Sequence, residues 1–167
     1  MNDLIIRAAQ FAAIHHYRQS RKYTSRPYIT HPNRVAMRAA VHPLATPEFV
    51  AAAFLHDILE DCEEIYLTDL YGSFGEVVGN LVQELTNVRS HNGDRQLRKL
   101  GDRNRLSQVS HEAKVLKLID RIDNVRELKT GDVEFRTMYY QETILLADIL
   151  RDADEELYQE LIGFVTP

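Results

Sequence analysis

The stretch His56-Asp57-Ile58-Leu59-Glu60-Asp61 decides how the rest of this sequence is interpreted. Read as a helix at about 100° per residue, it places the imidazole and the three carboxylates within an arc of about 140°. The two aliphatic residues fall on the opposite side, where they can pack into a core. Carboxylates held this close repel one another, and a divalent cation relieves that repulsion. The stretch therefore predicts a metal-dependent hydrolase.

The composition is that of an ordinary globular protein. The chain has 167 residues, of which 44% are hydrophobic and 27% charged, and this favours one domain with a sizeable core. The net charge of −5 argues against a nucleic-acid-binding surface. The single cysteine, Cys62, excludes an internal disulfide and a Cys-rich zinc site. No apolar run approaches the ~18 residues of a membrane span, and we expect a cytoplasmic protein without a membrane partner.

Helix-start signals precede the central stretch. Thr46 and Pro47 suit the N-cap and first position, which predicts a helix that continues to about Asp61. His31 precedes Pro32, which predicts His31 as the N-cap of a helix ending near residue 41. Apolar residues at helical spacing predict a first helix over residues 3–18.

The sequence after the central stretch is also helical in pattern. It predicts a short capped turn at 68–72, helices at 73–86, 132–152 and 154–163, and a further helix capped by Ser110. Residues 87–105 are polar and lack periodicity, which predicts either a solvated loop or a lid that faces phosphate. No strand–helix alternation is present, so the predicted class is all-α: a single-domain helical bundle over residues 1–167.

A basic loop lies between the first two predicted helices. Arg21, Lys22 and Arg26 alternate with Tyr23 and Tyr28. By itself such a segment is typical of a solvated loop. Beside an anionic ligand it could clamp a nucleotide, because arginine stacks on bases and forks onto phosphate, and lysine supplies a point charge.

Four candidate metal ligands stand on three predicted helices: His31, His56, Asp57 and Asp120. Two imidazoles and two carboxylates suit Mn²⁺, Fe²⁺ or Zn²⁺ better than Ca²⁺. Helical bundles build internal metal sites from facing helices in this way. Asp120 lies in a mostly apolar helix and needs a partner, for which Arg121 or a metal is a candidate. The alternative is a helical bundle in which these side chains only cap and pair.

Four segments of the chain resemble a known family. They are His16-Tyr17-Arg18-Gln19-Ser20-Arg21-Lys22, Pro27-Tyr28-Ile29-Thr30-His31-Pro32, the central stretch, and Lys117-Leu118-Ile119-Asp120-Arg121-Ile122-Asp123-Asn124. Shorter matches between them are Phe74-Gly75, Leu81-Val82 and Thr86. The resemblance is to the HD-domain phosphohydrolases, and within them to the hydrolase domain of the RelA/SpoT alarmone enzymes. It runs over residues 4–128, with the helices at 132–163 completing the bundle, and is closest to the stand-alone small alarmone hydrolases.

The resemblance implies removal of the 3′-pyrophosphate of (p)ppGpp, a small-molecule nucleotide, to give GDP or GTP. It implies that Mn²⁺, or another divalent transition metal, is bound by His31, His56, Asp57 and Asp120. It implies that the attacking water is positioned and activated by Glu60 and Asp61. It implies that the nucleotide is contacted by Arg21, Lys22 and Asn124.

Two departures from the family pattern bear on substrate choice. Residues 23–26 lack the glycine often seen there, and Glu127 stands where the long enzymes tend to have threonine. Hydrolysis of ppApp, removal of the 2′-phosphate of NADPH and a 5′-nucleotidase activity are therefore alternatives. A further alternative, from a different class, is a non-catalytic nucleotide sensor that keeps the pocket.

Overall fold

The computed structural model describes residues 3–87, 94–128 and 132–166. All regular elements in these ranges are helices, apart from an isolated bridge between Ser20 and Pro27, so the predicted all-α class is confirmed. The chain forms two compact units, residues 1–86 and 87–167, and each is described by itself. That the whole chain is a single domain stays a prediction.

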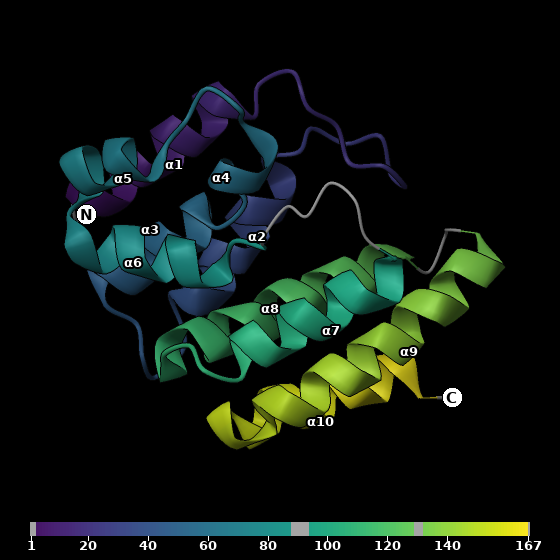
Figure 1. Cartoon of the computed structure of the whole chain (residues 1–167). Coiled ribbons are helices and arrows are strands. Elements are labelled where there is room, and N and C mark those ends of the chain that lie inside the picture. Colours follow the sequence, from purple (N-terminus) through teal and green to yellow (C-terminus); the bar gives the residue numbers. More distant parts are fainter. Residues whose placement is uncertain (1–2, 88–93, 129–131, 167) are drawn as a thin grey trace. The chain divides into compact units, whose positions relative to one another are not determined.

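The first unit is built around one short apolar helix. Its helices are α1 (Asp3–His15), α2 (Thr30–Ala39), α3 (Pro47–Leu55), α4 (Ile58–Asp61), α5 (Leu67–Phe74) and α6 (Glu76–Leu85). Helix α3 packs against α1, α2 and α6 and lies among them in Figure 1. Ala51, Ala52 and Ala53 are fully buried, and their small side chains allow neighbouring helices to approach closely.

The start of α3 follows the predicted signals, but its end does not. Thr46 accepts a hydrogen bond from the Phe49 amide at 3.1 Å, and Pro47 occupies the first position. The helix then ends at Leu55, where we expected it to continue to Asp61. His56 and Asp57 form a turn, and a new helical turn, α4, begins after them. The continuous helical wheel predicted for the central stretch is therefore wrong.

Other boundaries in the first unit also differ from prediction, among them the start of α6, which is Glu76 and not residue 73. Helix α1 ends at His15, three residues early, and residues 16–18 form a turn. Helix α2 begins at Thr30, which puts His31 inside the first turn and not at the N-cap. The reason is a preceding turn in which the amide of His31 already bonds the carbonyl of Tyr28 at 2.9 Å. The turn predicted at 68–72 is the helix α5.

In its described residues, 94–128 and 132–166, the second unit consists of helices and a 3₁₀ turn. They are α7 (Arg95–Leu106), α8 (His111–Glu127), α9 (Val133–Leu150), η2 (Arg151–Ala153) and α10 (Glu155–Val165). Helix α8 packs against α9 and α10, and α7 packs against α9. Predicted capping is confirmed at Ser110, which accepts from the Ala113 amide at 3.2 Å.

Helix α7 corrects the prediction of a loop over residues 87–105. Asp94 caps it by accepting from the Gln96 amide at 2.9 Å. Its apolar residues are only Leu97, Leu100 and Leu106, and the first two are 65% and 46% exposed, so the sequence is too polar for a clear apolar stripe. Residues 88–93 lie outside the described part of the chain.

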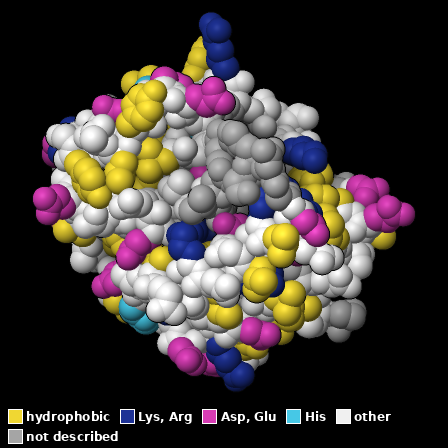
Figure 2. All heavy atoms as spheres, viewed as in Figure 1, with side chains coloured by type: hydrophobic (Ala, Val, Ile, Leu, Met, Phe, Trp, Pro, Cys, Tyr) yellow, Lys and Arg dark blue, Asp and Glu magenta, His cyan; other side chains and the backbone are white. Residues whose placement is uncertain are grey.

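Figure 2 shows acidic and basic side chains interspersed over the visible face, in keeping with the net charge of −5.

Candidate metal centre

Two imidazoles and one carboxylate converge in the first unit. One donor atom from each of His31, His56 and Asp57 lies within 4.8 Å of the other two. The Nε2 atoms of the histidines are 3.1 Å apart, and Oδ2 of Asp57 lies 3.5 Å from that of His31 and 3.2 Å from that of His56. Both histidines are buried. Three of the four predicted ligands therefore lie together.

The orientation of His56 is fixed by the end of α3. Its Nδ1 lies 2.9 Å from the carbonyl oxygen of Ala53, which can only accept a hydrogen bond. Nδ1 must therefore carry the proton, and in neutral imidazole this leaves a lone pair on Nε2. That lone pair is directed at the cluster. Metal-binding histidines are typically held in this way, by donation from the other ring nitrogen.

Asp57 stays ionised in this setting. Burial would raise the pKa of its carboxyl, but the charge of His56 and hydrogen bonds from both histidines outweigh burial and hold the pKa well below its usual range. Its Oδ2 also accepts a hydrogen bond from the Tyr28 hydroxyl at 2.6 Å. The cluster thus offers one ionised oxygen beside two imidazole nitrogens.

This donor set fits a divalent transition-metal ion. Imidazole nitrogen and carboxylate oxygen are the ligands that Mn²⁺, Fe²⁺ and Zn²⁺ share. The imidazoles are buried, and because Nδ1 of His56 faces the Ala53 carbonyl, Nε2 is the ring nitrogen that would give up its proton to bind a metal. Buried side chains held only for packing would not need to direct three donor atoms at one point.

Glu60 and Asp61 lie directly beyond the cluster in α4. Their amides both bond the carbonyl of Asp57 at 3.0 Å, which ties this helical turn to the ligand. The carbonyl of Asp61 accepts from the Gln19 side chain at 2.8 Å. The charge of Asp61 contributes to raising the pKa of Tyr28, after burial and the charge of Asp57. The carboxylate of Asp61 is therefore within electrostatic reach of the cluster.

Arg21 and Lys22 lie in a closed turn next to this site. The turn is held by backbone bonds from Arg21 to Arg26 at 2.8 Å and from Ser25 to Arg21 at 3.0 Å. The guanidinium of Arg21 lies 5.2 Å from the Tyr28 ring centre, and the ammonium of Lys22 lies 5.4 Å from that of Tyr23. Ser25 has φ of 53°, so in this turn a serine, and not a glycine, adopts the left-handed backbone conformation.

Asp120 and Asn124 belong to α8 in the second unit. Asp120 pairs with the ammonium of Lys117 at 2.9 Å and accepts from the Asn124 amide at 2.5 Å. The prediction that Arg121 is the partner of Asp120 finds no support, since its guanidinium lies over the Tyr139 ring at 4.8 Å. The spacing Lys117–Asp120 places both side chains on one helix face, and this signal was available in the sequence.

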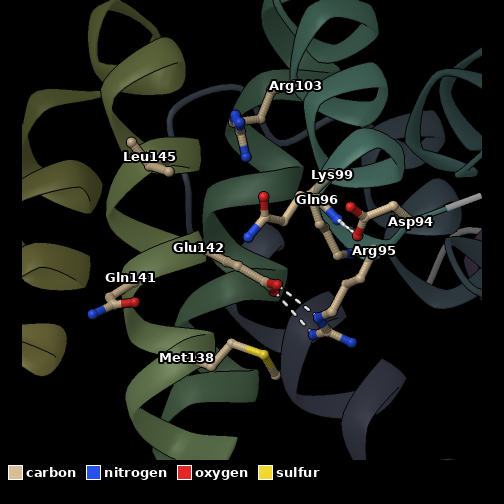
Figure 3. Close-up of a pocket in the computed structure, with 9 residues that line it drawn as sticks. All are labelled: Asp94, Arg95, Gln96, Lys99, Arg103, Met138, Gln141, Glu142 and Leu145. Atoms are coloured by element: carbon tan, nitrogen blue, oxygen red, sulfur yellow. Dashed lines mark hydrogen bonds and ion pairs between the residues drawn. The ribbon is translucent and has the colours of Figure 1, made fainter.

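A cavity of about 440 Å³ lies between α7 and α9 in the second unit (Figure 3). Arg95, Lys99 and Arg103 line it from α7, and Arg95 binds both oxygens of Glu142 at 2.7 and 3.0 Å. Burial, followed by the charge of Arg121, lowers the pKa of Lys99. Two basic residues of α7 thus have carboxylate partners, Arg95 in Glu142 and Lys99 in Asp102, and a lid function for this segment stays a prediction.

The residue that sequence reasoning overlooked is Tyr28. It was assigned to the basic loop, yet its hydroxyl bonds a candidate ligand that is 29 positions away in the chain. No local pattern reports such a contact. The tyrosine could have been suspected only because it precedes His31 by three residues.

The chain belongs to the HD-domain family, whose model matches residues 8–146. Its relatives include the guanosine-3′,5′-bis(diphosphate) 3′-pyrophosphohydrolase MESH1 of Drosophila melanogaster, 33% identical over 159 residues, which cover 91% of this chain and 87% of that protein. The MESH1 protein of Xenopus tropicalis is 37% identical over 134 residues, covering 75% of this chain and 70% of that protein.

A solved structure is also similar to this chain over nearly its whole length. It is described as a metazoan orthologue of SpoT that hydrolyses ppGpp and plays a role in starvation responses. Its TM-score is 0.89 at 28% sequence identity, and the match covers 98% of this chain and 94% of that one. The family predicted from the four motif segments is confirmed. Among the described helices, none has the length and apolar character needed to cross a membrane.

Proposed function

We propose that this protein is a metal-dependent hydrolase that removes the 3′-pyrophosphate of (p)ppGpp. The observation that carries the proposal is the cluster of His31, His56 and Asp57, in a chain that matches ppGpp hydrolases over most of their length. The products are pyrophosphate and GDP or GTP. The nucleotide is its small-molecule partner, and alarmone degradation in the cytoplasm is its role.

The proposed site holds Mn²⁺ through His31, His56, Asp57 and Asp120. The donor set fits manganese, although it fits iron and zinc as well. When bound, the ion supplies Lewis acidity, which offsets charge that develops on the phosphoryl oxygens. The protein groups then have two tasks: to hold the reacting atoms in place and to move a proton.

The proposed chemistry is attack by water on the phosphorus joined to the ribose 3′-oxygen. As the new P–O bond forms, the bond from phosphorus to the 3′-oxygen breaks, and that oxygen takes up a proton. Glu60 and Asp61 accept the proton that water loses, because α4 places them directly beyond the ligands. Arg21, Lys22 and Asn124 contact the nucleotide, and the positive charges of the first two suit its phosphates.

The test is pyrophosphate release from ppGpp by metal-stripped protein, with and without added Mn²⁺. Manganese-dependent release is expected. Release of phosphate from NADPH or nucleoside monophosphates, or pyrophosphate only from ppApp, would replace the proposed substrate by one of these. Tight binding of ppGpp without turnover in excess Mn²⁺ would identify a sensor.

The variant Glu60→Gln tests the proton acceptor. It should retain Mn²⁺ and lose about 100-fold or more in kcat, the usual contribution of a general base. Glu63→Gln is the matched control, because Glu63 is exposed and lies beyond the end of α4. Full activity in Glu60→Gln would remove this residue from the proposed machinery.

A further inference from the structure

Tyr28 lies between the basic loop and the candidate metal centre, and its two ends make different contacts. Its hydroxyl donates to Oδ2 of Asp57 at 2.6 Å. Its ring faces the guanidinium of Arg21 at 5.2 Å and lies 4.8 Å from the ring of His16. Its edge approaches His31 at 6.1 Å between ring centres. The side chain of Tyr28 therefore contacts both the basic loop and the cluster of candidate ligands.

The hydroxyl acts on the atom of Asp57 that faces the histidines. Oδ2 is the oxygen nearest to both Nε2 atoms, and it is also the oxygen that accepts from Tyr28. A carboxylate oxygen has two lone pairs, so one can face the cluster while the other takes the hydroxyl proton. The hydrogen bond limits rotation of the carboxylate group and keeps this oxygen directed at the cluster.

The backbone of Tyr28 is held in place next to the cluster. Its amide bonds the carbonyl of Gln19 at 2.9 Å, which fixes the point from which the hydroxyl reaches Oδ2 of Asp57 at 2.6 Å. The side chain of Asp61 is a second hydrogen-bond partner of this hydroxyl.

The ring acts on Arg21. A guanidinium over an aromatic face is attracted by the ring quadrupole, and this attraction favours one placement of Arg21. His16 supports the ring and is buried, because it lies in the turn that ends α1. The ring is thus a supported surface against which Arg21 of the closed turn is placed.

We propose that Tyr28 is a positioning residue with two separable roles: its hydroxyl orients Asp57 toward the metal, and its ring places Arg21 for the nucleotide. This inference rests on the proposed function for the identity of the ligands. Removal of the hydroxyl alone should weaken metal binding, and removal of the ring should weaken nucleotide binding as well.

The first test is Tyr28→Phe, which keeps the ring and removes the hydroxyl. Titration of Mn²⁺ into metal-stripped protein by calorimetry, without nucleotide, should show a Kd raised by about 10-fold or more, as is usual when a group that orients a metal ligand is lost. The KM for ppGpp at saturating Mn²⁺ should change by less than about twofold. Tyr66→Phe is the control, because this tyrosine is 66% exposed at the start of α5.

The second test separates the ring from the hydroxyl. Tyr28→Leu should show the same loss of Mn²⁺ affinity and, in addition, a KM raised by about fivefold or more. Arg21→Met should raise KM without changing the Kd for Mn²⁺. The double variant should be no worse in KM than the worse single variant, because ring and guanidinium act as one unit. If Tyr28→Leu does not fold, Tyr28→Phe and Arg21→Met still decide the hydroxyl and the arginine.

The outcomes of these tests decide the roles of the hydroxyl, the ring and the substrate separately. Parental Mn²⁺ affinity in Tyr28→Phe overturns the role of the hydroxyl, whatever the substrate proves to be. Additive effects on KM in the double variant overturn the role of the ring. A parental protein that binds Mn²⁺ but does not cleave ppGpp refutes the proposed function alone, because the metal titration is made without nucleotide.

Discussion

Replacement of Lys117 by methionine should destabilise the protein by about 3 kcal/mol or more. The Lys117 and Asp120 side chains are 7% and 5% exposed, and their charged atoms are 2.9 Å apart. At an effective dielectric constant of about 20, such a pair attracts by about 6 kcal/mol. Methionine keeps most of the volume but leaves the carboxylate buried without this cation. The loss is less than the full attraction because Asn124 still donates to Asp120.

The second unit contains a control of the same chemistry and spacing. Lys99 and Asp102 also stand three residues apart in a helix, but their charged atoms are 3.8 Å apart and the lysine side chain is 31% exposed. The longer distance weakens the attraction, and burial already disfavours the charged form of Lys99, so Lys99→Met should cost less than about 1 kcal/mol. The two variants therefore differ mainly in the burial and distance of the pair.

Urea unfolding in EDTA, followed by circular dichroism, measures both variants. Lys117→Met should lower the midpoint with an unchanged slope. Adding Asp120→Asn to Lys117→Met should recover part of the loss, because the uncompensated charge is then removed. Equal losses in Lys117→Met and Lys99→Met, or a loss below about 1 kcal/mol in the former, would refute the reasoning.

Three further predictions concern packing, thiol chemistry and metal. Gly79→Ala should lower the free energy of unfolding by about 1–3 kcal/mol in thermal unfolding, because the added Cβ would clash with a carbon of the Tyr71 ring. Gly72→Ala is the control: its Cβ would meet nothing within 4 Å, so it should be neutral or stabilising. Burial first, then nearby acidic charge, raises the pKa of Cys62 from 9.0 to about 11. At pH 8 the thiolate fraction of Cys62 should therefore be about 100-fold lower in the folded than in the urea-unfolded protein. Equal rates of Cys62 alkylation by iodoacetamide in the two states would contradict this. Mn²⁺ at 100 times its Kd should stabilise the protein by about 2.7 kcal/mol, and a persistent gain in His31→Ala would exclude that residue as a ligand.

Capping residues made the helices predictable where polar side chains mark their starts. Thr46 and Ser110 each accept from an amide three residues on, as expected. Helix α7 could not be predicted in the same way, because only three leucines, at 97, 100 and 106, stand among polar residues and glycine in its sequence. Its cap, Asp94, was present in the sequence, yet a cap without an apolar face is a weak signal.

The candidate ligands were predictable as residue types, but their geometry was not. His31, His56 and Asp57 lie together as the motifs suggested, and their role as metal ligands stays a prediction. The turn between α3 and α4 was missed because helical spacing cannot reveal where a helix stops without proline or glycine. The bond from Tyr28 to Asp57 joins distant segments, so only the tertiary structure could reveal it.

The bond from His56 to the carbonyl of Ala53 has a consequence for mutational robustness. The acceptor that orients this imidazole belongs to the backbone, so no substitution at position 53 can delete it. Asp57 differs, because it depends on the Tyr28 hydroxyl, and a single base change from a tyrosine to a phenylalanine codon removes that group. Random substitutions should therefore remove the hydrogen bond that orients Asp57 more readily than the one that orients His56.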